Sequence, residues 1–191
     1  MVRVEEVKSE HGARGDIMAI EVTMGRESCL IINVYNDEYN TAVDRLYMPY
    51  DASRSTIITG DFNLHHPHWS PDHCHESPHA DALTDWMATK GFVLVNDPGT
   101  ITFLRGRDTS TLDLTWVNMA IIDSGLVTDW KVHNEMDHAS DHFPVSNLEH
   151  VHPHRTPGKH DSSPLPKIHF FPEQEEGMEE TVLERCQHVR S

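Results

Sequence analysis

The sequence predicts one layered α/β domain over residues 1–150, followed by a tail over residues 151–191. Three observations lead to this fold class. Short β-rich runs alternate with two segments of helical apolar spacing, and interleaved strands and helices are typical of α/β layers. Hydrophobic residues make up 37% of the chain, which is enough to bury a core. The composition also changes near residue 150, where the periodic pattern ends.

The tail differs from the domain in composition. Residues 151–191 contain five prolines, a polar run at 156–163 and an acidic run at 173–180. Such a mixture cannot bury enough apolar surface to fold alone. We therefore expect a disordered Pro/His/Glu-rich tail.

The strands are predicted from β-branched and aromatic runs bounded by turn residues. The first two runs lie on either side of Gly25 and Arg26, so they are expected to form a hairpin within one sheet. Gly60 is expected to end the third run. The predicted strands are residues 17–23, 29–35, 55–59, 92–95, 111–117, 127–133 and 144–148.

Two helices are predicted from apolar residues spaced i, i+3, i+4. Pro49 should end the first, which is short, and Gly91 is a natural left-handed cap for the second, over about residues 80–90. Their inward positions are Val43, Leu46 and Tyr47 in the first helix, and Leu83, Trp86 and Met87 in the second.

The charge of the chain restricts its function. Fifteen Lys and Arg against 31 Asp and Glu give a formal net charge of −16. An acidic protein does not bind nucleic acid through a basic surface alone. A nucleic-acid substrate would have to be held by a metal ion or by local charge, such as the small basic spot at Arg105 and Arg107, which is equally well read as a solvated loop.

Membrane and secretory features are missing from the pattern. No apolar run approaches the roughly 18 residues of a membrane span, so no membrane partner is expected. The three cysteines, Cys29, Cys74 and Cys186, are odd in number and scattered. This pattern fits a reducing, intracellular compartment rather than a disulfide framework.

Polar residues that could bind a metal ion or take part in catalysis lie at or near strand ends. Asp61 and Asn63 follow a buried strand, Asp113 interrupts an apolar strand, and Asp141 and His142 begin the last strand. Carboxylates, a carboxamide and a histidine suit a hard cation with oxygen ligands and a nearby base. If the chain stays extended, Asp61 and Asn63 share one face. Asp-x-Asn is also a common turn that closes on its own backbone.

Ordered motifs here resemble a known family. Residues 60–63 (GDFN), 110–114 (STLDL) and 140–144 (SDHFP) resemble the endonuclease/exonuclease/phosphatase superfamily. The likeness is greatest to the endonuclease domain of non-LTR (LINE-type) retrotransposons and runs from about Gly15 to Leu148. The stretches 31–36, 64–69 and 96–106 also look like that subgroup.

The resemblance implies a DNase I-like four-layer sandwich of two mixed β-sheets flanked by helices. It also implies phosphodiester hydrolysis that depends on Mg²⁺, or on Mn²⁺, with DNA as the substrate and a nuclear location if DNA is indeed the substrate. A bound cation would neutralise charge that an acidic protein alone could not.

The resemblance also implies a role for each matching residue. His142 would activate water, Asp113 would orient His142, and Tyr35 would hydrogen-bond the phosphate. Asp61 would align the nucleophile and Asn63 would contact the scissile phosphate, while Asp141 would orient the histidine. The implied metal contacts are Asp141, Asp61 and Asn63.

The N-terminus departs from the family pattern. Complete members begin with strands that carry an Asn or Asp and then a metal-binding Glu, and this chain resembles one that starts after both. Glu5, Glu6 and Glu10 lie in no matching motif and precede the first expected strand. We therefore expect weakened Mg²⁺ binding and an unpaired sheet edge that favours self-association.

Two alternatives remain beside an active nuclease. One is a catalytically inactive remnant of the same fold. The other is a zinc-binding interaction module within residues 65–79, because imidazole and thiolate are the usual zinc ligands. Its candidate ligands are His65, His66, His68, His73, Cys74, His75 and His79. In the family reading, His65 and His66 are instead loop residues near the site and Trp69 is a packing residue.

Overall fold

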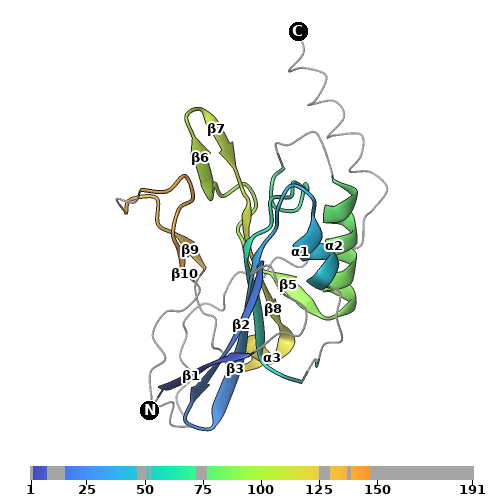
Figure 1. Ribbon diagram of the computed structural model, residues 1–191, viewed down its shortest axis with the longest axis vertical. Coiled ribbons are helices and arrows are strands. Elements are labelled where there is room, and N and C mark those ends of the chain that lie inside the picture. The colour runs from blue at the N-terminus through green and yellow to red at the C-terminus, as the bar shows by residue number, and fades with distance from the viewer. Residues whose placement is uncertain are drawn as a thin grey trace.

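A computed structural model of the chain describes residues 2–7, 16–46, 51, 53–71, 77–124, 130–136 and 139–146. The expected tail, Tyr47, Pro49 and the outer parts of the two last predicted strands lie outside these residues. A six-stranded mixed sheet forms the centre, in the order β1-β2-β3-β4-β8-β5 (Figure 1). Its strands are β1 Val2–Val7, β2 Ile17–Met24, β3 Glu27–Tyr35, β4 Thr56–Asp61, β5 Phe92–Leu94 and β8 Asp113–Asn118.

The sheet is surrounded by smaller elements. Only β3 and β4 pair in parallel, and the other neighbours in the sheet are antiparallel. Two separate two-stranded ladders join β6 Phe103–Arg105 to β7 Asp108–Ser110, and β9 Lys131–Val132 to β10 Val145–Ser146. The helices are α1 Thr41–Leu46, α2 Pro78–Thr89 and α3 Met119–Ser124.

The fold class is confirmed as a mixed α/β fold, with differences in detail. Where two mixed sheets were expected, the described residues show one large sheet and the two small ladders. The hairpin of β6 and β7 and the helix α3 were not predicted, because their apolar runs are too short to show a period. No helix within the described residues is long and apolar enough to span a membrane.

The N-terminal expectation was wrong at one point. Glu5 and Glu6 do not precede the first strand but lie in β1, which pairs antiparallel with β2. Valine and charged residues alternate from Val2 to Glu5, as in an edge strand, but Glu6 breaks the alternation. The pattern is too short to stand out beside the longer apolar runs. β1 therefore pairs with β2 and is itself the edge strand on this side of the six-stranded sheet.

Two apolar clusters pack against the sheet, in keeping with the alternation of side chains along a strand. In β4, Ile58 belongs to the larger cluster, which includes the buried side chains of α1 and α2. Its neighbour Ile57 belongs to the smaller cluster with Ile121 of α3. In Figure 1, α1 and α2 lie together on one side of the sheet.

Both predicted helices are present. Leu83 and Met87 of α2 are fully buried, while Trp86 is partly buried against the larger cluster. Gly91 ends α2 in the left-handed conformation, with φ +73°, and its N–H donates to the Ala88 carbonyl. The predicted glycine cap is thus confirmed.

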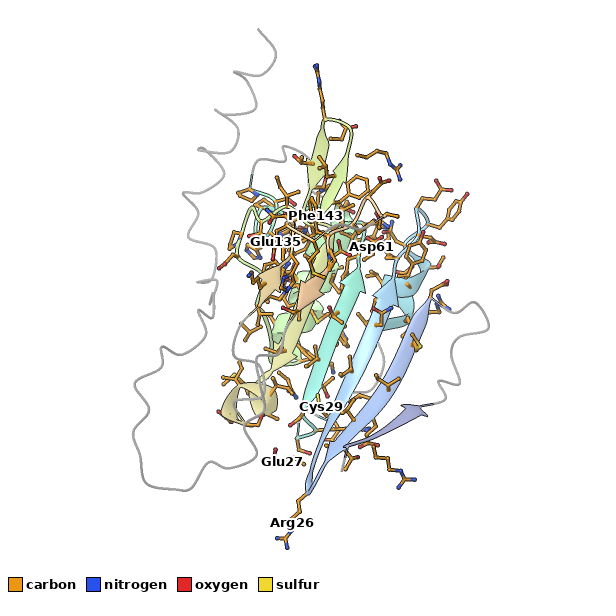
Figure 2. All side chains as sticks on the ribbon, turned by 90° about the vertical axis from the view of Figure 1, so that its left-hand side faces the viewer. Arg26, Glu27, Cys29, Asp61, Glu135 and Phe143 are labelled. Carbon is orange, nitrogen blue, oxygen red and sulfur yellow. The ribbon has the colours of Figure 1, made fainter. Side chains whose placement is uncertain are left out.

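One glycine brings the backbones of β3 and β4 into close approach. Gly60 lies within β4 rather than after it, with φ +136°. A Cβ atom at this position would lie 2.0 Å from the Val34 carbonyl oxygen. Glycine is therefore required just before Asp61. Asp61 ends β4 at the same end of the sheet as the projecting β6–β7 hairpin (Figures 1 and 2).

Candidate active site

A short turn after β4 presents Asp61 and Asn63. The backbone N–H of Asn63 donates to Asp61 Oδ1 at 3.1 Å, and Asn63 Nδ2 donates to Asp61 Oδ2 at 3.1 Å. Asn63 has φ +48°, so the chain does not stay extended through it as the shared-face argument assumed. The Asp-x-Asn turn that closes on its own backbone is the correct local reading, and it still joins the two polar groups. Phe62 between them is buried in the core.

A buried asparagine holds this turn in place. Asn36 Nδ2 donates to the Phe62 carbonyl at 2.8 Å, and the Asn36 carbonyl accepts from Asn63 Nδ2 at 2.8 Å. Sequence reasoning placed Asn36 in a family-like stretch but gave it no role. The Asn36 side chain is fully buried, and a buried amide must have partners, but no local pattern in the sequence marks it.

Asp113 begins β8 opposite Asp61, since the two are paired residues in the antiparallel register. Its backbone is fixed by two buried side chains that sequence reasoning also missed. Thr102 Oγ1 accepts from the N–H groups of Leu112 and Asp113, both at 2.9 Å. Asn96 Nδ2 donates to the Asp113 carbonyl at 2.9 Å. Fully satisfied networks of this kind make a single arrangement rigid.

His142 and Asp113 form a hydrogen-bonded dyad. Nδ1 of His142 lies 2.9 Å from Asp113 Oδ2, and Nε2 lies 3.7 Å from Asp61 Oδ2. An ionised carboxylate can only accept, so it favours the tautomer with the proton on Nδ1. Nε2 then carries a lone pair and faces Asp61. The prediction that a charge within this strand needs a partner is thus confirmed.

The two carboxylates affect each other. The pKa of Asp61 is raised, first by burial and then by the negative charge of Asp113, while His142 and the bonds from Asn63 act in the opposite direction. A carboxylate that is costly to ionise favours a nearby positive charge. The site therefore concentrates negative charge in a place where a cation would be stabilised.

Asp141 is turned to a different partner. Arg105 Nε donates to its Oδ2 at 2.7 Å, and the pair is on the surface, with side-chain exposures of 71% for Arg105 and 44% for Asp141. Asp141 directly precedes His142 in the chain. Its carboxylate is bound by the hairpin rather than by the histidine.

Tyr35 lies beside the site at the end of β3. It is paired with Asp61 in the parallel register, so the two side chains leave the sheet on the same face. The Tyr35 side chain is 54% exposed, and its hydroxyl forms no hydrogen bond with the described residues. It is therefore available to a ligand that reaches Asp61.

A family comparison covers all of these residues. A family model described as endonuclease-reverse transcriptase matches residues 29–146, more than half of the chain, including the dyad and the segments that support it. The chain belongs to this family. The resemblance to the endonuclease/exonuclease/phosphatase superfamily, and within it to retrotransposon endonucleases, is confirmed, and family membership supports a nuclease-type hydrolase.

Solved structures agree with the fold. The endonuclease domain of TRAS1, a telomere-specific non-LTR retrotransposon, is similar with a TM-score of 0.57 and 18% identity, over 78% of this chain and 81% of that one. Two others have a TM-score of 0.44. One is cytolethal distending toxin from Actinobacillus actinomycetemcomitans, at 16% identity over 74% of this chain and 56% of that one. The other is an endonuclease/exonuclease/phosphatase family protein from Leptotrichia buccalis C-1013-b, at 17% identity over 76% and 59%.

The likeness to the TRAS1 domain shows a DNase I-like fold and no more than that. The chain spans less than two thirds of the length of the toxin and of the Leptotrichia protein. No curated protein matches the chain in a sequence comparison.

The donor set of this family member suits a metal ion held jointly with a substrate. In the described part of the chain, no group of three or more carboxylate, imidazole or thiolate side chains is arranged to enclose a metal ion. Asp61 and Asn63 offer oxygen atoms from one turn. Mg²⁺ commonly takes only one or two protein carboxylates and completes its shell with phosphate oxygens and water.

The acidic residues of β1 are far from this donor set. Glu5 pairs with Glu21, and the register continues through Leu30 to Thr56, five residues before Asp61 in β4. In the same register Glu6 is level with Ile57, four residues before Asp61. At about 3.3 Å per residue, β1 places these glutamates more than roughly 10 Å along the strands from the site.

The histidine-rich segment is a structural support in its described part. His66 is buried, its Nδ1 accepts from the backbone N–H of His68 at 3.1 Å, and its ring stacks on Trp69. His66 lies in a loop, as expected, and its ring packs against Trp69. Trp69 is fully buried, as expected of a packing residue. His73, Cys74 and His75, needed for the zinc reading, lie outside the described residues.

Proposed function

We propose that the chain hydrolyses phosphodiester bonds of DNA with the help of Mg²⁺ or Mn²⁺. Members of the family generally depend on a divalent metal ion. The observation that carries the proposal is the dyad, in which Asp113 holds Nδ1 of His142 at 2.9 Å while Nε2 faces Asp61 at 3.7 Å. Three separate parts of the chain thus converge on one point.

His142 acts as the general base in this proposal. Asp113 keeps the proton on Nδ1, so Nε2 can accept a proton from water, and the resulting imidazolium is stabilised by the carboxylates on both sides. A histidine held in this way raises the rate roughly 10²- to 10⁴-fold. Asp61 aligns the attacking water, because its oxygen lies on the side to which Nε2 points.

The phosphate is held by the remaining polar groups. Tyr35 is at the exposed edge of the site and donates a hydrogen bond to a phosphate oxygen. Asn63 is also exposed, but both hydrogens of its Nδ2 already bond Asn36 and Asp61, so it contacts the phosphate through a cation bound to its Oδ1. A divalent cation bound by Asp61 and Asn63 would neutralise the charge that develops on the phosphate. Asp141 is less suited to this contact, since Arg105 already donates to its Oδ2.

Plasmid nicking tests the proposal. Purified protein is incubated with supercoiled plasmid in Mg²⁺, in Mn²⁺ and in EDTA. We expect slow nicking that needs the metal and falls at least 100-fold in His142→Ala and in Asp61→Ala. His79→Ala is the matched control, because this partly exposed histidine on α2 lies outside the site. Equal nicking by His142→Ala and wild type would show that the assignment is wrong.

An inactive remnant of the same fold is the second candidate. The observation that favours it is that the described residues contain no group of three or more carboxylate, imidazole or thiolate side chains that could hold a metal ion. Fewer ligand charges mean weaker cation binding. Wild-type protein that binds plasmid but stays at the rate of His142→Ala, even in high Mn²⁺, would identify this case.

A further inference from the structure

We propose that Arg105 is a positioning residue, which acts through Asp141 and Phe103 to fix His142 in the dyad. This inference rests on the proposed function, because it names a residue that supports its general base. Arg105 belongs to the β6–β7 hairpin, which projects beyond the end of the central sheet on the same side as the site (Figure 1).

The hairpin is tied to the histidine segment by its backbone. Leu104 N–H donates to the Asp141 carbonyl at 2.8 Å, and Phe143 N–H donates to the Thr102 carbonyl at 2.8 Å. Between these bonds, Phe103 and His142 form an antiparallel bridge. β6 therefore runs directly beside residues 141–143 and sets where their backbone lies.

The side chains continue this contact in a stack. The ring of Phe103 meets the ring of His142 edge to face, with centroids 5.0 Å apart and planes at 65°. The guanidinium carbon of Arg105 lies 5.4 Å from the centre of the Phe103 ring. The imidazole is thus held between Phe103 on one side and the Asp113 carboxylate bonded to Nδ1.

Arg105 closes the arrangement by its bond to Asp141. The Nε–Oδ2 distance of 2.7 Å is that of a charge-assisted hydrogen bond. Asp141 directly precedes His142, so the bond restrains the backbone that carries the imidazole. Arg107, two residues further on, forms no ion pair with the described residues. The two arginines share charge and hairpin but differ in this bond, which makes Arg107 a matched control.

Nicking rates separate positioning from charge. In Arg105→Ala we expect the rate at saturating plasmid to fall about 10- to 100-fold, as small misplacements of a catalytic group do, with a smaller change in KM. Arg107→Ala removes the same charge and should change mainly KM. In an Asp141→Ala background, Arg105→Ala should cause little further loss. Equal losses of rate in the two arginine variants, or additive losses in the double variant, would overturn the proposal.

Nuclear magnetic resonance of the imidazole gives a readout that needs no activity. The side-chain ¹⁵N signals of His142, assigned by their loss in His142→Ala, report the bond from Nδ1 to Asp113. We expect Arg105→Ala to shift these signals and Arg107→Ala to leave them at the wild-type positions. Unchanged signals in Arg105→Ala would overturn the proposal even if the chain nicks DNA. Shifted signals in a chain that never nicks would refute the proposed function and leave the positioning role intact.

Discussion

The site is made of two halves that are supported in different ways. The sheet half consists of Asp61, Asn63 and Asp113, which leave the ends of β4 and β8 and are held by buried amide and hydroxyl groups. The loop half consists of Asp141 and His142, which lie on an irregular segment and are held by an exposed hairpin. The comparison teaches that the carboxylates are placed by the core, whereas His142, the proposed base, is placed by a surface element.

The two halves should therefore respond differently to mutation. Mutations under the sheet half should cost stability and activity together, because buried donors and close backbone contacts are involved. Mutations in the hairpin should cost activity with little loss of stability, since exposed ion pairs contribute little to folding.

The largest effect is expected at Gly60. Gly60→Ala places a Cβ atom 2.0 Å from the Val34 carbonyl at φ +136°, so β3 and β4 must separate. We expect a loss of at least about 4 kcal/mol, or no folding. Gly106→Ala in the hairpin turn is the control, as it has φ +66° but nothing within 4 Å, and should cost only about 1 kcal/mol. Urea unfolding followed by circular dichroism measures both, and equal losses would contradict the comparison.

Thr102 should give the next largest effect. Thr102→Val keeps the shape but leaves the buried N–H groups of Leu112 and Asp113 without their acceptor. At about 1–3 kcal/mol for each group, we expect a loss of roughly 2–4 kcal/mol in the free energy of unfolding. Thr102→Ser should recover most of it, and the exposed Thr109→Val on β7 should stay within about 0.5 kcal/mol of wild type. A neutral Thr102→Val would mean that these bonds do not hold Asp113.

The sheet half was predictable from sequence because its residues follow regular apolar runs. Asp61 and Asp113 could be recognised as polar residues where a buried strand ends or is interrupted, and both lie at the paired end of β4 and β8. The strands of the large sheet other than β1, and both main helices, could be predicted for the same reason. The regular spacing of apolar residues is the signal that predicts these strands and helices.

The supports of the site were not predictable, since they depend on contacts between distant segments. Thr102 bonds a backbone ten residues away, and Asn36 bonds Phe62 across 26 residues. Neither has a local signature. Arg105 was read as a basic spot or a solvated loop, because only the folded chain brings it to Asp141, 36 residues later. The edge strand β1 was missed for want of a long apolar run.

A smaller loss of stability is expected when the pH is lowered, because of His68. Burial, with a contribution from His66, lowers the pKa of His68 from 6.5 to about 4, and the two rings lie 4.2 Å apart. The neutral form is thus favoured in the fold, so stability present above pH 6.5 is lost as pH falls toward 4. Allowing for its partial exposure, we expect roughly 1 kcal/mol.

Urea unfolding at pH 7 and pH 5 measures the His68 contribution. His68→Gln should reduce the loss between these two pH values, whereas the control His79→Gln, at a partly exposed histidine, should not. An acid sensitivity that is the same in His68→Gln and wild type would contradict the prediction.

Asp61 should give the smallest change in stability, and in the opposite direction. Its pKa is raised by burial and by Asp113, so the folded chain binds this proton more tightly than the unfolded chain does. Ionised Asp61 therefore opposes folding once pH exceeds the folded pKa, and the effect vanishes where both states are protonated. Asp61→Asn should be slightly more stable than wild type at pH 7–8, equal to it in strong acid, and inactive in nicking. Unfolding curves across this pH range measure the difference, with the exposed Asp123→Asn on α3 as the control. A carboxylate that hinders its own fold is better explained by a catalytic or cation-binding task than by packing, and a wild type more stable than Asp61→Asn at neutral pH would remove that reason.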